Sequence, residues 1–435
     1  MAGPGAFAMA VGLVLGLRFF LFISRYAVNV LFWDQWDYLD RFFDGDPGFA
    51  EVFFLQHGPH RLGLGLIATK FLYPLTDWNV RCESFMIGGC IFVAMLLALL
   101  LKKRLFGRLD YSDAFIPAMF LTLAQYETVI GTPIAAHSTF PLLLTMLYGL
   151  ALLRQNYLWR YGLVLLVNVL SIYTGFGVFM GAITIGLFAL FCYWRWRGVI
   201  SVPPVAPISG LLVACASLAS FFVNYEFQPA VDCFEFPYHR LVDYPRFVAL
   251  MFSTFTGIRS PTRFATILGM AILLPAIFIL GDTIRRAVRA EVGGQVHLMV
   301  AILLGYSMLF AANTAVGRVC LGLPAAAQAS RYATLLIPAF LAMYLYLRAL
   351  HRKVLREIAL GLLALVLMPG LAHVSGHASW YADGKRTWVS CYKRTEDIGY
   401  CDSSTGFAIY PDAERRGLKQ KLDYLKNRKL NLFAE

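Results

Sequence analysis

The chain has 435 residues, of which 59% are hydrophobic and only 15% are charged, and its formal net charge is +12. A soluble domain has about 25% charged residues, so this composition excludes an ordinary soluble protein and predicts a polytopic membrane protein. Because lipid offers the backbone no hydrogen-bond partners, the spanning segments must be helices, and no period-two barrel pattern is present. The positive charge then belongs to loops that contact lipid head groups, and we expect no nucleic-acid partner.

Apolar runs long enough to cross a membrane recur along the whole chain. They predict an all-α fold with about eleven transmembrane helices. We interpret the first run as a retained anchor rather than a cleaved signal peptide, and TGFGV (174–178) as a tight turn between two helices. The runs lie near residues 7–31, 84–101, 113–130, 138–153, 161–175, 177–193, 205–223, 264–281, 297–315, 331–349 and 358–372.

The distribution of Lys and Arg predicts the orientation of this transmembrane domain (1–372). One set of loops is short and rich in cations, so it should face the cytoplasm together with the N-terminus. The other side then carries two long outer loops, 33–83 and 224–263, and the C-terminal tail, 373–435. Within these loops we expect short interfacial helices at 62–76 and at 247–258, the second of which is either interfacial or re-entrant. The cation-rich loops lie near residues 102–108, 154–160, 195–197, 285–289 and 348–356.

Carboxylates cluster directly after the first apolar run. Asp34 and Asp37 are three residues apart and would share one face of a helix, with Trp33 and Trp36 at the head-group level. A solvated acidic loop is the ordinary alternative. However, like charges repel, and their cost is larger near lipid, so the cluster favours a functional site. Six of the 26 acidic residues fall here, namely Asp34, Asp37, Asp40, Asp44, Asp46 and Glu51.

Two further motifs carry cations that could bind an anion. In LQHGPHRLG, the residues His57, His60 and Arg61 would present one cationic face on a helix that begins near Pro59. Interfacial histidines in a loop are the alternative.

Arg318 and Arg331 flank an outer loop, and Tyr332 follows the second arginine. An arginine at a helix start is either neutralised by a carboxylate or reserved for an anion. Glu127, at the outer end of the third run, has the same ambiguity, and His137 follows in the next turn.

The tail carries two further signals. Cys391 and Cys401 lie where a disulfide could form, with Cys233 as a possible third partner, whereas the other cysteines are interpreted as packing residues. No Cys/His spacing predicts a zinc site. Leucines at 418, 422 and 425 predict a short amphipathic helix. The cysteines assigned to packing are Cys82, Cys90, Cys192, Cys215 and Cys320.

The motifs WDQWDYL (33–39), QHGPHR (56–61) and GR…SRY (317–332) together resemble those of the GT-C glycosyltransferases, in particular a bacterial group of polytopic glycosyltransferase-like proteins. The resemblance implies a GT-C-like fold in the bacterial inner membrane. Members of that group often carry Asn-Glu between the two histidines. This sequence has Gly58-Pro59 there and therefore lacks that acid.

The resemblance also implies an activity, the transfer of a sugar from a polyprenyl-phosphate-linked donor to a cell-surface glycan or lipid-linked acceptor, with inversion. We expect Asp34 to be the general base and Asp37 to position the acceptor or hold a divalent cation, with no cofactor otherwise certain. Aromatic residues would stack on sugar faces or border the lipid. The expected substrate-binding residues are His57, His60, Arg61, Arg318, Arg331, Tyr332, Trp33, Trp36 and Glu127.

Three other activities remain open from the sequence. A transporter or flippase of lipid-linked sugars would place polar groups near the bilayer midplane, whereas most ionisable residues here lie at the ends of the apolar runs. A membrane acyltransferase would use a buried histidine such as His57 or His137. A non-catalytic scaffold would use the acidic loop only to bind a partner.

Overall fold

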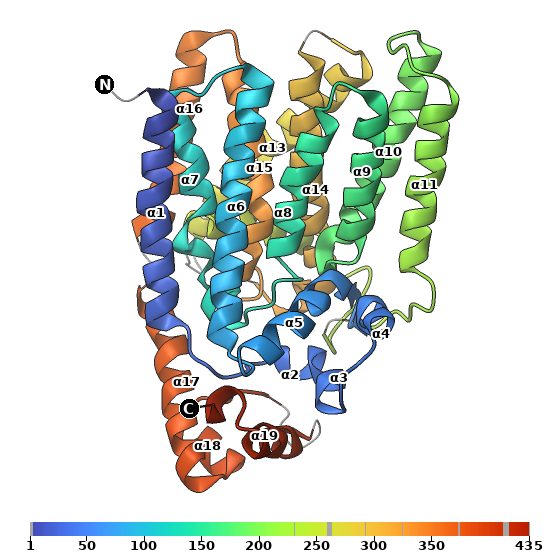
Figure 1. The fold of residues 1–435 in the computed structure, drawn as a ribbon. Coiled ribbons are helices and arrows are strands. Elements are labelled where there is room, and N and C mark those ends of the chain that lie inside the picture. Colours follow the sequence, from blue (N-terminus) through green and yellow to red (C-terminus); the bar gives the residue numbers. More distant parts are fainter. Residues whose placement is uncertain are drawn as a thin grey trace.

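The long helices of the computed structural model run roughly parallel in one bundle (Figure 1). The structure describes residues 3–229, 231–258, 263–291, 293–323, 325–372, 375–411 and 417–434. The short helices α2–α5, α18 and α19 gather at one end, which we call the loop end, and the N-terminus lies at the opposite end (Figure 1).

The described residues form the following helices and strands, in chain order. The first half contains α1 (Pro4–Tyr26), α2 (Gln35–Tyr38), α3 (Asp40–Phe43), α4 (Phe49–Phe54), β1 (Gln56–His57), β2 (His60–Arg61), α5 (Gly63–Leu75), α6 (Val80–Phe106), η1 (Tyr111–Ala114), α7 (Phe115–Phe120), η2 (Leu123–Gln125), η3 (Glu127–Gly131), α8 (Thr139–Leu152), α9 (Tyr157–Ile172), η4 (Gly175–Gly177), α10 (Val178–Trp196) and α11 (Val205–Phe221). The second half contains α12 (Asp243–Thr254), α13 (Arg263–Val288), α14 (Gly294–Arg318), η5 (Val319–Leu321), η6 (Ser330–Tyr332), α15 (Ala333–Ala349), α16 (Lys353–Ala372), α17 (Ser375–Thr395), α18 (Ile398–Thr405), α19 (Leu418–Asn427) and η7 (Asn431–Phe433).

Seven segments of the described chain are helices long and apolar enough to cross a membrane. Their outer faces expose large apolar side chains, such as Leu17 and Leu365, which lipid would cover. This agrees with an all-α membrane protein. The predicted number of about eleven spans is not established, because α8, α9 and α11 are apolar but shorter. The seven segments are Pro4–Tyr26, Val80–Phe106, Gly175–Trp196, Arg263–Val288, Gly294–Leu321, Ser330–Ala349 and Lys353–Thr395.

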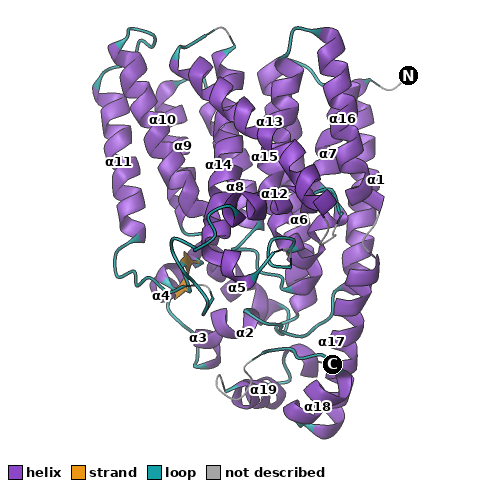
Figure 2. Ribbon diagram, turned by 180° about the vertical axis from the view of Figure 1, so that it is seen from behind, coloured by secondary structure: helices purple, strands orange, loops and turns teal. Residues whose placement is uncertain are grey.

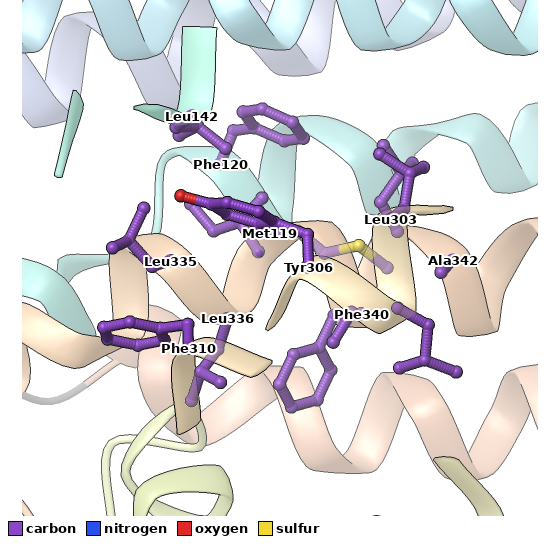
Figure 3. Packing of buried hydrophobic residues seen from close by; sticks show 14 of the residues in the cluster. Met119, Phe120, Leu142, Leu303, Tyr306, Phe310, Leu335, Leu336, Phe340 and Ala342 are labelled. Carbon is purple, nitrogen blue, oxygen red and sulfur yellow. The ribbon is translucent and has the colours of Figure 1, made fainter. Parts of the chain in front are cut away.

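The main hydrophobic core surrounds α15, whose residues from Ala333 to Leu345 are all buried. Side chains from α7, α8, α14 and α15 interdigitate there (Figure 3). Phe310 and Leu335 lie in this core, and both also line the cavity described below. The apolar wall of the cavity is therefore continuous with the packed centre of the bundle.

A second hydrophobic core joins the first loop to the C-terminal tail. Phe32 stacks on Phe407 with ring centroids 5.5 Å apart, and the backbone amide of Trp33 donates to the carbonyl of Ile409 (2.9 Å). Leucines 418, 422 and 425 of α19 are buried in this core, which confirms the predicted amphipathic helix. The tail is thus packed into the same unit as the first loop.

The loop end contains two disulfides among the described residues. One joins Cys391 to Cys401, as the tail sequence had suggested. The other joins Cys233 to Cys320, so the interpretation of Cys320 as a packing residue is wrong. This second bond links the segment after α11 to the chain after α14, which are far apart in the sequence.

The segment predicted to be interfacial or re-entrant at 247–258 lies inside the bundle. Its helix, α12, packs against α13, α14 and α15, and its residues from Phe247 to Thr254 are all buried. The prediction of an interfacial helix is therefore wrong, because both faces of α12 are covered by protein. The re-entrant alternative agrees with this burial.

The side chain of Asn431 provides a test of the second core. It is fully buried, donates to the carbonyl of Trp78 (2.7 Å) and to the side chain of Asn29 (3.1 Å), and accepts from the amide of Leu31 (3.4 Å). Asn431→Ala leaves these groups unpaired and should lower the stability by about 1–3 kcal/mol. The control Asn427→Ala changes an exposed residue of α19. Equal melting temperatures for the two purified variants would contradict the role given to this core.

Candidate functional site

A cavity of about 760 Å³ lies at the loop end. Its walls come from the first loop, the β1–β2 hairpin, the segment between η3 and α8, η4, the segment after α11, the end of α14 and the start of α15. Elements from most of the chain therefore meet there. Among the predicted site residues, the cavity is lined by Trp33, Asp34, Asp37, His57, His60, Arg318, Arg331 and Tyr332, and not by Trp36, Arg61 or Glu127.

The two aspartates of the first loop have different environments. Asp34 immediately precedes α2, and its half-buried carboxylate has no hydrogen bond or ion pair within 4 Å among the described residues. Asp37 instead accepts a hydrogen bond from the hydroxyl of Tyr410 (2.8 Å) in the tail. Asp40, also in the wall, pairs with Lys421 of α19 (2.7 Å). The carboxylate of Asp34 is thus the one of the three that has room for a ligand.

The predicted helix through His57, His60 and Arg61 is wrong. These residues form a two-residue antiparallel hairpin in which His57 faces His60 and Gln56 faces Arg61 (Figure 2). Gly58 has φ +54°, a left-handed conformation that suits a turn and interrupts a helix. The two histidines therefore lie side by side at the cavity, and α5 begins only at Gly63.

Arg61 is a structural residue. It is 3% exposed, and its guanidinium donates to the carbonyls of Phe221 (2.8 Å), Val223 (2.5 Å) and Phe54. These carbonyls lie at or just beyond the ends of α11 and α4, where backbone acceptors lack helical partners. Nε, Nη1 and Nη2 of Arg61 each donate one hydrogen bond to these carbonyls, and this holds the hairpin against α11.

Arg318 and Arg331 are the cations that line the cavity. Neither forms an ion pair within 4 Å among the described residues, and the guanidinium of Arg331 lies 5.7 Å from the ring of Tyr332. Glu127 accepts from the backbone amide of Arg331 (3.3 Å), so it helps to place the start of α15. The guanidinium groups of both arginines are thus available to an anion in the cavity.

Two histidines of the cavity wall, His60 and His137, are uncharged at neutral pH. Burial, with the neighbouring His137, Arg318 and His57, lowers the pKa of His60 well below 6.5. Burial, with His57, Arg318 and Arg331, lowers the pKa of His137 to about 3. Solvent reaches both rings only in part. The expectation that His60 supplies positive charge is therefore wrong, because burial in the cavity wall, together with His137 and Arg318, disfavours the protonated ring.

The two tryptophans of the first motif lie in different environments. Trp33 is 45% exposed, has φ +51° and lines the cavity, where its ring is available to a sugar or a lipid chain. Trp36 is 0% exposed and stacks on Phe43 in the second core (centroids 6.1 Å apart). Trp36 therefore cannot contact a substrate, and its burial follows from the position of α2 against the tail.

Several cavity residues were not predicted. The turn TGFGV does more than reverse the chain, because Phe176 lies in the wall, 4.4 Å from the ring of His60 and 4.8 Å from that of Phe310. His137 also lines the cavity, and the sequence had suggested a role for it only as the histidine of a membrane acyltransferase. No sequence signal marks Thr128, Thr132 and Ser138, or Gln228, Pro229 and Val231.

A bound metal ion was one role considered for the aspartates. Within the described ranges, no three His, Cys, Asp or Glu side chains are grouped so that they could hold a metal ion. The rings of His57 and His60 are 6.4 and 5.4 Å from that of His137. The protein groups that the cavity wall offers are the carboxylate of Asp34, two guanidinium groups, imidazole rings and an apolar face.

The neutral state of His137 predicts a dependence of stability on pH. Between about pH 3 and pH 6.5 the unfolded chain binds a proton at this residue and the folded protein does not, so stability falls as the pH drops below 6.5. Each pH unit in this window costs about 1.4 kcal/mol. His137→Gln should therefore show a smaller loss of melting temperature between pH 8 and pH 5 than the wild type. His351→Gln, an exposed control, should behave like the wild type. Superimposable profiles for His137→Gln and wild type would contradict a buried neutral ring.

Comparison of the chain with protein-family models, with curated proteins and with solved structures finds no match. The interpretation of the cavity therefore depends on its own geometry, in which an unpartnered carboxylate lies in the same enclosed space as two arginines and an aromatic wall.

Proposed function

We propose that the protein is a membrane glycosyltransferase of the GT-C type that transfers a sugar from a polyprenyl-phosphate donor to a glycan or a lipid-linked acceptor. The observation that carries this proposal is the combination of groups around one cavity. Asp34 is available to accept a proton, Arg318 and Arg331 are available to an anion, and Phe176 and Phe310 form an apolar wall. An amphiphilic phosphate needs both the cationic and the apolar surface.

The reaction assigned to these groups is a single displacement with inversion. The acceptor oxygen attacks the anomeric carbon of the sugar while its proton passes to the carboxylate of Asp34. The bond between the anomeric carbon and the phosphate oxygen breaks, and its electron pair leaves with the prenyl phosphate. Arg318 and Arg331 stabilise the charge that grows on this leaving group. Asp37, held by Tyr410, positions the acceptor, and Trp33 offers a stacking surface.

Our proposal includes about eleven membrane crossings, formed by the seven long segments, the shorter apolar helices α8, α9 and α11, and the interrupted segment from α7 to η3. It also places the loop end on the extracytoplasmic side of a bacterial inner membrane. Two disulfides at this end, Cys233–Cys320 and Cys391–Cys401, support this orientation because disulfides persist in oxidising compartments. The cation-rich loops then face the cytoplasm.

A transporter or flippase of lipid-linked sugars is the alternative function. It would need polar groups along a path between the two sides of the bilayer. The described cavity is lined from elements at the loop end, and the core below it is packed with apolar side chains from α14 and α15 (Figure 3). The arrangement therefore favours chemistry at one side of the membrane.

Asp34→Asn tests the proposal most simply. Loss of the general base should lower sugar transfer from a polyprenyl-phosphate sugar by about 10²–10⁴-fold, while expression and melting temperature stay normal. The matched control is Asp44→Asn, an exposed aspartate of the same cluster outside the cavity wall, which should transfer like the wild type. Transfer is measured in vesicles that contain a panel of polyprenyl-phosphate hexoses. A well-folded Asp34→Asn protein with full activity would refute the assignment.

A further inference from the structure

His137 is the half-buried group in the cavity wall to which the proposed reaction assigns no role. It lies between η3 and α8, where its backbone amide donates to the carbonyl of Ile134 (3.2 Å). Its ring contacts those of His60 and Phe176, with centroids 5.4 and 6.1 Å away. The ring therefore contacts both a polar and an apolar residue of the cavity wall.

The backbone of η4 fixes the position of this ring. Gly175 has φ +59°, and a Cβ atom at that position would lie 3.0 Å from Cδ2 of His137. The absence of a side chain at Gly175 thus allows the ring to pack directly against the turn. A ring held in this way keeps its nitrogen atoms in fixed directions.

One nitrogen atom of this fixed ring has no partner. Nε2 of His137 is buried and makes no hydrogen bond with any described residue. A buried polar atom without a partner destabilises the folded protein, so such an atom on a residue of the cavity wall points to a group that a ligand satisfies.

The surroundings of His137 define the chemistry of that ligand. Burial and the charge of His57 lower the pKa of the imidazole most, and Arg318 and Arg331, which line the same cavity, lower it further, so the ring is neutral and one of its nitrogen atoms carries a proton. A ligand group that lies against two guanidinium groups is anionic, and toward an anion the imidazole acts as a hydrogen-bond donor.

We propose that His137 donates a hydrogen bond through Nε2–H to the phosphate group of the prenyl-phosphate substrate, as a neutral third donor beside Arg318 and Arg331. This inference rests on the proposed function, because it assigns a residue to the leaving-group site of the same reaction. The neutral donor stabilises the phosphate in both the donor and the product without adding another positive charge to the cavity.

Binding of farnesyl phosphate to the full-length protein in nanodiscs tests this assignment, with inorganic phosphate as a second probe. His137→Ala should weaken farnesyl phosphate binding by about 10–100-fold, because a hydrogen bond to a charged group contributes about 1.5–3 kcal/mol. His137→Gln, which retains an N–H donor, should recover most of the affinity. The ³¹P resonance of the bound phosphate should shift in His137→Ala.

His297→Gln is the matched control. His297 also has a buried nitrogen without a partner, Nδ1, but it lies at the end of α14 remote from Arg318. This variant should bind farnesyl phosphate like the wild type and leave the ³¹P resonance unchanged. Melting temperatures show whether each variant is folded.

The outcomes separate the two proposals. Wild-type affinity in folded His137→Ala, together with lost affinity in Arg331→Ala, overturns the role of His137 and leaves the proposed function intact. A loss in His137→Ala that occurs with farnesyl phosphate but not with inorganic phosphate also overturns it, because the ring would then contact the chain. Failure of the wild type to bind farnesyl phosphate overturns the proposed function and this inference together.

Discussion

The packing of the C-terminal tail against the first loop is the constraint on which the cavity depends. Lys385 of α17 is buried and donates to the carbonyls of Ile130 (2.9 Å) and Gly131 (2.6 Å), at the end of η3. Lys421 of α19 donates to the carbonyl of Trp36 (2.9 Å). The tail therefore holds two separate walls of the cavity, the acidic loop and the segment that leads to His137.

This constraint explains how carboxylates and cations meet in a small space. The acidic wall comes from the first loop and is stabilised by the tail, whereas Arg318 and Arg331 come from α14 and η6 in the main core. Asp37 accepts a hydrogen bond from Tyr410 and Asp40 pairs with Lys421, so both carboxylates are tied to the tail. What remains available in the cavity is the carboxylate of Asp34 together with the guanidinium groups of Arg318 and Arg331, next to imidazole rings.

The sequence predicted the features that depend on composition and on local pattern. Apolar runs predicted the long helices. The acidic cluster in an otherwise apolar chain identified Asp34 as a candidate site residue, and the arginines that flank an outer loop identified Arg318 and Arg331. It could not predict features that depend on tertiary contacts. Arg61 resembles the other cations in sequence, and only the carbonyls of α11 and α4 make it structural. Trp36 resembles Trp33, and only the tail buries it.

The incorrect prediction of a helix through His57, His60 and Arg61 had a local sequence signal against it. Gly58-Pro59 is a turn dipeptide, and it should have favoured a hairpin over a helix start. The environment of His137 had no such signal, because it is created by Gly175 and Phe176 from a different helix pair. The pairing of Cys233 with Cys320 likewise joins two segments that are separated by 87 residues.

A structure of the protein in a lipid bilayer with a bound prenyl phosphate tests the central claim, that this cavity is the site of a lipid-linked phosphate. The account predicts that the phosphate lies within hydrogen-bonding distance of Arg318 and Arg331, with the first isoprene units along Phe176 and Phe310 and Asp34 facing the open side. A phosphate bound elsewhere, or a lipid chain that fills the cavity while its head group lies away from both arginines, would contradict it.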